Sequence, residues 1–354
     1  MDRVLAYAGH GFLPMEALIS GVEKVSSFPV IRRGTSLYGG NDYERCTACL
    51  VFGAKEPVNR VLRDQRDHDT PVLVADLGYI KRGNVPDARA DPDNIYWSVN
   101  LNGLNGWGGP PRSGMPKDRW RALDIPIAPW QSSGGHYVVC GQKPHDAAID
   151  GVNPQRWLIE TVTHLRSLTD APIRWRPHPD DHTNRRLDIH GQNITKSFGT
   201  ALAEDLKGAI ATVAFNSNSL VESLIAGVPI YVLGGGSVCP DMGHSLLTED
   251  TLSAPLHPER APFFADLAYR QWTIPEFEQG LPWLHFFAAL VSPHNEPPHP
   301  VPAPARPRRK RRASPPISPG EDTHVVPTAI PSSEEFSTNL LSVEALTKTI
   351  HRGD

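Results

Sequence analysis

The chain has 354 residues, 39% of them hydrophobic and 21% charged, and a formal net charge of −4. These values are typical of a globular protein with room for two domains, and they exclude a uniformly basic nucleic-acid binder. No run of about 18 apolar residues occurs, so the sequence predicts no membrane span. The start is too short and too soon polar for a signal peptide, and the four scattered cysteines do not suggest a disulfide framework. We therefore expect a cytoplasmic protein.

Residues 1–132 alternate apolar runs with polar connections, which predicts a first α/β domain. One helical pattern follows Gly11 and ends near Lys24, and a second covers residues 58–66. Turn residues dominate positions 100–111, which predicts an irregular and functional loop. Buried strands are predicted at residues 4–8, 48–52, 71–75 and 95–99.

Residues 133–254 repeat this alternation and predict a second α/β domain. Helical patterns cover residues 154–168, 200–207 and 219–226. Strands are predicted at residues 136–140, 173–176, 193–196, 210–215 and 230–233. Alternation in both parts predicts two doubly wound, Rossmann-like domains with parallel sheets, which bind ligands at the carboxyl ends of their strands.

The remaining chain changes character twice. Residues 255–292 are apolar and aromatic, and we expect helices that pack back on the core. Residues 293–331 hold 12 of the 35 prolines and the basic run Arg306–Arg312, so they predict a disordered linker. That run is a candidate nucleic-acid contact. Residues 332–354 predict a short terminal helix.

A strand–turn–helix–strand unit at residues 214–236 is the clearest local pattern. Ser219 reads as the helix N-cap, and Glu222 three residues later completes a capping box. Gly227 and Pro229 end the helix, and the backbone N–H groups at its start predict a phosphate site. We expect Gly234–Gly236 to let the backbone approach a ligand.

Four short stretches follow predicted strands and carry a resemblance. They are Asp76-Leu-Gly-Tyr-Ile-Lys-Arg-Gly83, Gly141-Gln-Lys-Pro-His-Asp146, Arg176-Pro-His-Pro179 and the serine- and glycine-rich unit above. Together they resemble the capsular polysaccharide biosynthesis family, which includes the Kdo transferases of the GT-B fold. The resemblance covers about residues 70–245 and leaves the first 60 residues and the tail uncovered.

The resemblance implies two domains facing a cleft, with a nucleotide-sugar donor on the second domain. No Asp-x-Asp motif of the metal-dependent type occurs in the predicted sites, and Arg176, His178 and Lys196 offer donors to a leaving phosphate. We therefore expect no metal and no other cofactor. The implied acceptor-side residues are Lys81, Arg82, Asn102 and Asn105. The implied donor-side residues are Gln142, Asp146, Arg176, His178, Asn216, Ser217, Ser219 and Glu222.

The general base has two candidates, Asp76 and His10. Asp76 ends a strand inside a family-like motif, although an aspartate there can also be a simple strand-end cap. His10 lies in the loop after the first strand, a position that a histidine occupies in several GT-B families. We favour Asp76.

Other candidates also keep a structural alternative. Glu222 closes the capping box or holds a donor ribose, and His178 between two prolines is a ligand or a buried structural residue. Arg176 binds phosphate or pairs with Asp180 or Asp181. Cys46 and Cys49 suggest zinc, but core packing is favoured because no second pair exists.

These patterns predict a glycosyltransferase that moves a sugar from a nucleotide-sugar to a hydroxyl acceptor. The acceptor is a glycan or a hydroxylated base in DNA, as in virus-type DNA modification. The alternatives are a non-catalytic nucleotide- or glycan-binding protein on the same scaffold and a GT-B-shaped nucleotide-sugar epimerase.

Overall fold

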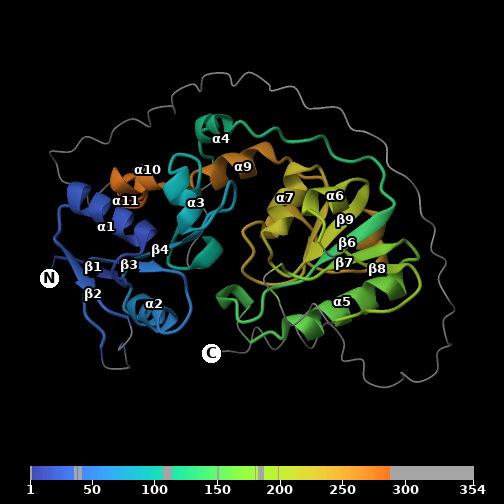
Figure 1. Cartoon of the computed structure of the whole chain (residues 1–354), viewed down its shortest axis with the longest axis horizontal. Helices are drawn as coiled ribbons and strands as arrows, with labels where there is room; N and C mark the ends of the chain where they lie inside the picture. The colour runs from blue at the N-terminus through green and yellow to red at the C-terminus, as the bar shows by residue number, and fades with distance from the viewer. Residues whose placement is uncertain are drawn as a thin grey trace, which may run out of the picture. The chain divides into compact units, whose positions relative to one another are not determined.

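The computed structural model describes residues 2–35, 38, 42–106, 114–149, 151–179, 181, 187–197 and 199–287. These residues all belong to one compact unit, Met1–Pro304 (Figure 1). The predicted linker, the basic run and the terminal helix lie outside the described residues, as do Trp107 and Asp180. In the described part of the chain, no helix is both long and apolar enough to cross a membrane.

The first sheet has six strands in the order β11-β5-β4-β3-β1-β2. Strands β1 to β4 are parallel, whereas β5 runs antiparallel to β4 and β11 antiparallel to β5. The expectation of a wholly parallel sheet is therefore wrong at this edge. The strands are β1 (Val4–Tyr7), β2 (Val30–Arg33), β3 (Ala48–Phe52), β4 (Val72–Leu77), β5 (Tyr96–Leu101) and β11 (Gln271–Thr273).

Two of these strands were not predicted, for a shared physical reason. Strand β2 is a half-buried edge strand with two arginines, and β11 has only three residues, so neither gives a long apolar run. Helix α1 (Leu13–Val25) buries Met15 and Leu18 against the sheet. The other helices before residue 130 are α2 (Val58–Asp67), α3 (Val85–Ala90) and α4 (Asp118–Leu123).

The second sheet is wholly parallel, as predicted, with the strand order β10-β9-β6-β7-β8. Helix α5 (Pro154–Leu168) matches its predicted bounds because Asn153 caps it with a side-chain oxygen and Pro154 sits at its first position. The strands are β6 (His136–Cys140), β7 (Ile173–Arg176), β8 (Ile194–Lys196), β9 (Ala209–Ala214) and β10 (Ile230–Val232), and the other helices are α6 (Leu202–Leu206), α7 (Ser219–Ile225) and α8 (Glu249–Ser253).

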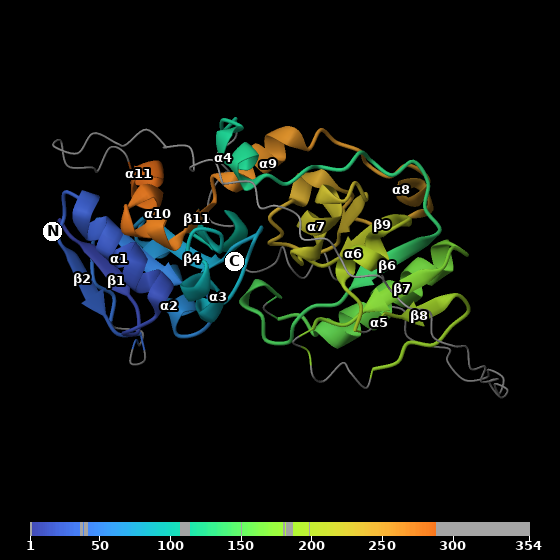
Figure 2. The same cartoon turned by 45° about the horizontal axis from the view of Figure 1, so that its top comes forward.

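The segment after the second sheet returns to the first one. It runs through α9 (Ala261–Ala268) into β11, α10 (Ile274–Glu278) and α11 (Leu281–Phe287), and the last two pack on α1 (Figure 2). The packing is close: a Cβ added to Gly21 of α1 would lie 1.8 Å from the carbonyl oxygen of Phe277. Arg119 of α4 fastens the same segment by donating to Glu276 (2.5 Å) and to the carbonyl of Gln271 (2.8 Å). Residues far apart in sequence therefore complete the first sheet.

Candidate functional site

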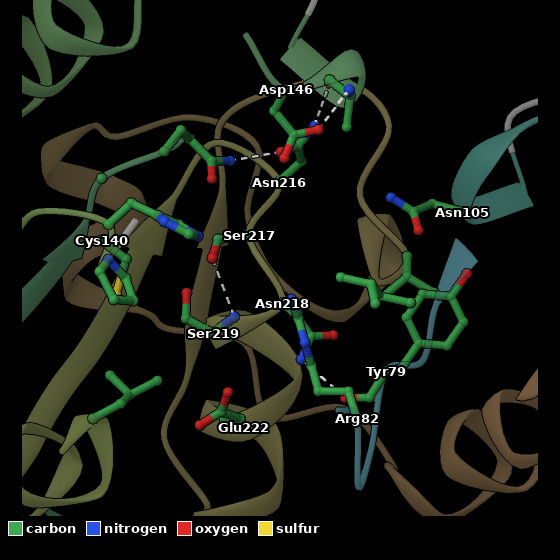
Figure 3. Close-up of a pocket in the computed structure, with 18 of the residues that line it drawn as sticks. Tyr79, Arg82, Asn105, Cys140, Asp146, Asn216, Ser217, Asn218, Ser219 and Glu222 are labelled. Carbon is green, nitrogen blue, oxygen red and sulfur yellow. Dashed lines mark hydrogen bonds between the residues drawn. The ribbon is translucent and has the colours of Figure 1, made fainter. Parts of the chain in front are cut away.

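A cavity of about 470 Å³ lies at the carboxyl ends of strands from both sheets (Figure 3). Asp76 of β4, Cys140 at the end of β6, Arg176 at the end of β7 and the turn after β9 all reach it. This is where α/β folds bind ligands. Its lining includes the predicted residues Asp76, Arg82, Asn105, Gln142, Asp146, Arg176, His178, Asn216, Ser217, Ser219 and Glu222.

The predicted residues His10, Lys81 and Asn102 are not brought to this cavity. His10 lines a second cavity of about 310 Å³ together with Arg32 and Arg33. The ammonium group of Lys81 donates to the carbonyl of Leu123 (2.7 Å). The side-chain oxygen of Asn102 accepts from the N–H of Val72 (2.8 Å). Of the two base candidates, Asp76 is the one that shares a cavity with the predicted donor side.

The Asp76 carboxyl has a raised pKa, and its surroundings explain the direction. Burial has the largest effect, and the negative charge of Asp146 also raises the pKa. The N–H of Leu77, which donates to Asp76 Oδ1 at 2.7 Å, opposes this shift, as do the charges of Arg82 and Lys55. A carboxylate with a raised pKa is a stronger proton acceptor than an ordinary aspartate, as a general base requires.

The turn between β9 and α7 is organised by the side chain of Asn216. Its amide nitrogen donates to the carbonyls of Ala148 (2.6 Å) and Gly235 (3.0 Å), and its oxygen accepts from Gln142 (2.6 Å). Both Asn216 and Gln142 are buried. These two predicted ligands therefore hold the shape of the turn as well as lining the cavity.

The predicted capping box at the start of α7 is wrong. Asn218 precedes the helix with helical φ/ψ angles of −61° and −15°, so the helical geometry begins before Ser219 and no side chain caps it. The hydroxyl of Ser217 instead accepts from the N–H of Ser219 (3.2 Å). The Ser219 hydroxyl is buried, and the thiol of Cys140 is its hydrogen-bonding neighbour. It borders the cavity, as Figure 3 shows.

Because Glu222 does not bond back to the helix start, its carboxylate remains on the cavity wall. Desolvation by the surrounding protein raises its pKa, and the charges of Arg82 and Arg176 lower it. The interpretation of Glu222 as a capping residue is therefore wrong, and its role as a ligand for a donor ribose remains a prediction.

Arg176 pairs with Asp205 of α6 and not with Asp181. The guanidinium also donates to the carbonyl of Thr200 (3.0 Å). His178 lines the cavity between two prolines, half-buried. Lys196 does not line the cavity, because its ammonium donates to the carbonyl of Leu187 (2.6 Å) and lies over the Trp175 ring.

The cavity residues that the sequence reasoning did not name as site residues include Tyr79, Ser98 and Asn218. Asn218 donates to the carbonyl of Tyr79 (2.9 Å), which joins the turn before α7 to the loop after β4. Asn218 stands inside the polar turn that the sequence singled out, so its position was a usable signal. Tyr79 belongs to the quoted motif at residues 76–83 and is buried, but it was not named as a site residue.

Two further sequence interpretations can be assessed. Gly234–Gly236 does not line the cavity; a Cβ at Gly234 would lie 2.3 Å from the Phe215 ring, so close packing explains that glycine. The carbonyl of Gly236 accepts from Asn105 (2.9 Å). Cys46 and Cys49 are unpaired and buried in an apolar cluster, which confirms the core interpretation.

The described residues contain no group of three or more His, Cys, Asp or Glu side chains arranged to hold a metal ion. Metal independence itself remains a prediction.

No protein-family model matches the chain, and no curated protein matches it in sequence. Among solved structures it is similar to the β-Kdo 2,4 transferase of Thermosulfurimonas dismutans KpsC, with a TM-score of 0.50 and 12% identity over 77% of this chain and 92% of that one. The β-Kdo 2,7 transferase of the same protein has a TM-score of 0.49 and 15% identity, over 79% of this chain and 98% of that one. The UDP-GlcNAc 2-epimerase of Methanocaldococcus jannaschii has a TM-score of 0.33 and 10% identity, over 81% of this chain and 100% of that one. The first of these likenesses establishes the fold: the chain has the two-sheet α/β architecture of a Kdo transferase, the GT-B type implied by the sequence resemblance.

Proposed function

We propose that the protein is a metal-independent glycosyltransferase that moves a sugar from a nucleotide-sugar donor to a hydroxyl acceptor. One observation carries this proposal. A single cavity brings the Asp76 carboxyl, with its raised pKa, together with Arg176, His178 and the serine turn before α7. A proton acceptor and a set of phosphate-binding groups are the two requirements of sugar transfer from a nucleotide.

The donor lies against the second sheet. Arg176, His178 and the hydroxyls of Ser217 and Ser219 bind its phosphates, and Arg176 is fixed for this task by Asp205. Glu222 accepts hydrogen bonds from the ribose hydroxyls. As the bond from the sugar to the phosphate breaks, these donors stabilise the charge that develops on the leaving phosphate.

The acceptor enters from the side of the first sheet, past Arg82 and Asn105. Asp76 takes the proton of the acceptor hydroxyl while that oxygen bonds to the anomeric carbon, and the nucleotide departs with both electrons of the broken bond. The acceptor is a glycan or a hydroxylated base in DNA. Arg306–Arg312 would hold the latter through its phosphates.

The test is an incubation of the protein with UDP-, GDP-, CMP- and TDP-sugars, each with a glycan acceptor and with DNA that contains a hydroxymethylated base. We expect one nucleotide class to raise the melting temperature and to be released in step with the glycosylated product, and Asp76→Asn to abolish the release. Stabilisation by a nucleotide without turnover identifies a binding protein. A changed sugar on an intact donor identifies an epimerase. Either result overturns the proposal.

A further inference from the structure

The loop after β4 has every backbone N–H group from residue 77 to residue 80 engaged. Leu77 donates to the Asp76 carboxylate (2.7 Å), and Gly78 donates to the carbonyl of Tyr96 (3.2 Å). Gly78 is required there, because an added Cβ would lie 2.3 Å from that same carbonyl oxygen. The backbone N–H groups that directly follow the proposed base Asp76 in β4 therefore all have hydrogen-bond acceptors.

The two remaining N–H groups donate to one distant side-chain atom. The N–H groups of Tyr79 and Ile80 donate to Oε1 of Gln271, at 3.1 and 3.0 Å. Gln271 is 0% exposed and belongs to β11, which is added to the sheet edge from more than 190 residues further along the chain. No local turn partner replaces this oxygen, so without it two buried donors would lose their acceptor.

Tyr79 is also held by its other two polar groups. Its hydroxyl accepts from Asn100 of β5 (2.8 Å), and its carbonyl accepts from Asn218 of the turn before α7 (2.9 Å). Tyr79 is thus hydrogen-bonded both to Gln271 and to Asn218 in the turn before α7. Displacing it would move Asp76 and Asn218 together.

We infer that Gln271 is a positioning residue for the transfer reaction. It does not line the cavity, but its side-chain oxygen fixes the loop that orients the Asp76 carboxylate and supports Asn218. This inference rests on the proposed function. A displacement of about 1 Å in a catalytic group can cost about 10²-fold in rate, so a supporting residue of this kind has a large kinetic effect.

The chain offers an isosteric series at this position. Gln271→Met keeps the volume and removes the acceptor, whereas Gln271→Glu keeps an acceptor oxygen. The Gln271 amide nitrogen has no hydrogen-bond partner among the described residues, so the glutamate loses no bond there. Gln65→Met is the matched control. Gln65 belongs to α2, is also 0% exposed and bonds distant groups, the thiol of Cys46 and the carbonyl of Glu44.

We expect Gln271→Met to lower kcat by about 10- to 100-fold while the dissociation constant of the nucleotide changes by less than about threefold. Gln271→Glu should recover kcat to within about fivefold of wild type, and Gln65→Met should keep kcat within about twofold. Hydrogen–deuterium exchange supplies a readout that needs no turnover: the amides of residues 79 and 80 should exchange faster in Gln271→Met alone.

Two outcomes overturn the inference while the proposed function stands. One is a wild-type enzyme that transfers sugar while Gln271→Met and Gln65→Met lose kcat equally. The other is unchanged exchange at residues 79 and 80 in Gln271→Met. If Gln271→Met does not fold, Gln271→Glu decides, since a folded glutamate variant with kcat below about a tenth of wild type contradicts positioning through the oxygen. A wild-type protein that turns over no nucleotide-sugar overturns the proposed function itself, and the kinetic role falls with it.

Discussion

The Asp205 carboxylate holds the Arg176 guanidinium at the rim of the cavity. The pair is mostly buried, with 17% of the arginine side chain and 7% of the aspartate side chain exposed. Asp205 also accepts from the hydroxyl of Ser197. The guanidinium donates to Asp205, to the Ser197 hydroxyl and to the carbonyl of Thr200. Its remaining N–H groups are available for phosphate.

Asp205→Asn should therefore weaken nucleotide binding without touching the ligand. Removing one partner of a buried pair costs about 3–5 kcal/mol, and the retained amide oxygen recovers part of this. We expect a lower melting temperature and roughly tenfold weaker nucleotide binding by calorimetry. The control is Glu204→Gln, in the exposed pair of Glu204 with Lys207, where an effect of about 0–1 kcal/mol is expected. Equal nucleotide affinities in the two variants would contradict a role of Asp205 at the site.

Ser219 and Ser217 allow binding to be separated from stability. The Ser219 hydroxyl meets only the thiol of Cys140, a weak hydrogen-bonding group, so Ser219→Ala should change the stability of the unliganded protein only slightly. If this hydroxyl meets a donor phosphate, the same change weakens nucleotide binding by on the order of 1 kcal/mol. Ser217→Ala removes the bond to the N–H of Ser219 and should lower both stability and affinity. Thermal unfolding and calorimetry measure the two effects. Unchanged nucleotide affinity in the double variant would falsify the phosphate assignment.

The second sheet could be predicted almost completely from sequence, and the reason is physical. Its central strands β6 and β9 are buried on both faces and its strands alternate with helices, so apolar runs and helical periods mark most of them clearly. The first sheet was harder, because β11 is contributed by residues 271–273 after the second domain. No local sequence pattern indicates that these residues pair with β5 of the first sheet.

The site divides in the same way. Residues that directly follow buried strands, such as Asp76 and Arg176, could be located because topology places strand ends together. Side-chain partners could not be predicted, because they depend on tertiary geometry. Examples are the pairing of Asp205 with Arg176, the bond from Tyr79 to Gln271 and the missing side-chain cap at the start of α7. The capping-box motif failed because the backbone of Asn218 is already helical.

The basic run Arg306–Arg312 distinguishes the two acceptor classes, although it lies outside the described residues. Six positive charges can neutralise several phosphates, and each contributes roughly 0.7–0.9 to the slope of log K against log salt. If DNA is the acceptor, changing Arg308, Arg309, Lys310, Arg311 and Arg312 to Gln should weaken binding and flatten that slope. Gel-shift titrations at two salt concentrations measure both. The absence of DNA binding by the wild type at low salt would exclude this acceptor, and normal transfer to a glycan by the mutant would support the other.

Asp76 makes stability and activity respond to pH in opposite ways. Its pKa is raised in the folded protein, so the ionised carboxylate destabilises the fold above the unfolded-state pKa of about 4, and this penalty disappears as the pH falls. Asp76→Asn should therefore raise the melting temperature at pH 7 and converge with the wild type in acid. The same variant should lose about 10²–10⁴-fold in turnover, because the amide cannot accept a proton. Thermal unfolding between pH 4 and pH 8 measures the first effect, and a variant that is less stable than wild type at pH 7 would contradict the raised pKa.

Removing a charge near Asp76 should shift the pKa seen in the pH profile of kcat/KM in a predictable direction. A base must be ionised, so kcat/KM should fall as the pH drops through the pKa of Asp76 and level off above it. Asp146 raises that pKa and Arg82 lowers it. Asp146→Asn should therefore shift the acid limb of the profile to lower pH, and Arg82→Gln should shift it to higher pH, each by roughly half a unit for a screened charge. The position of the limb is the readout, since both variants can also change its height. Shifts in the same direction, or a profile without an acid limb, would show that another group accepts the proton.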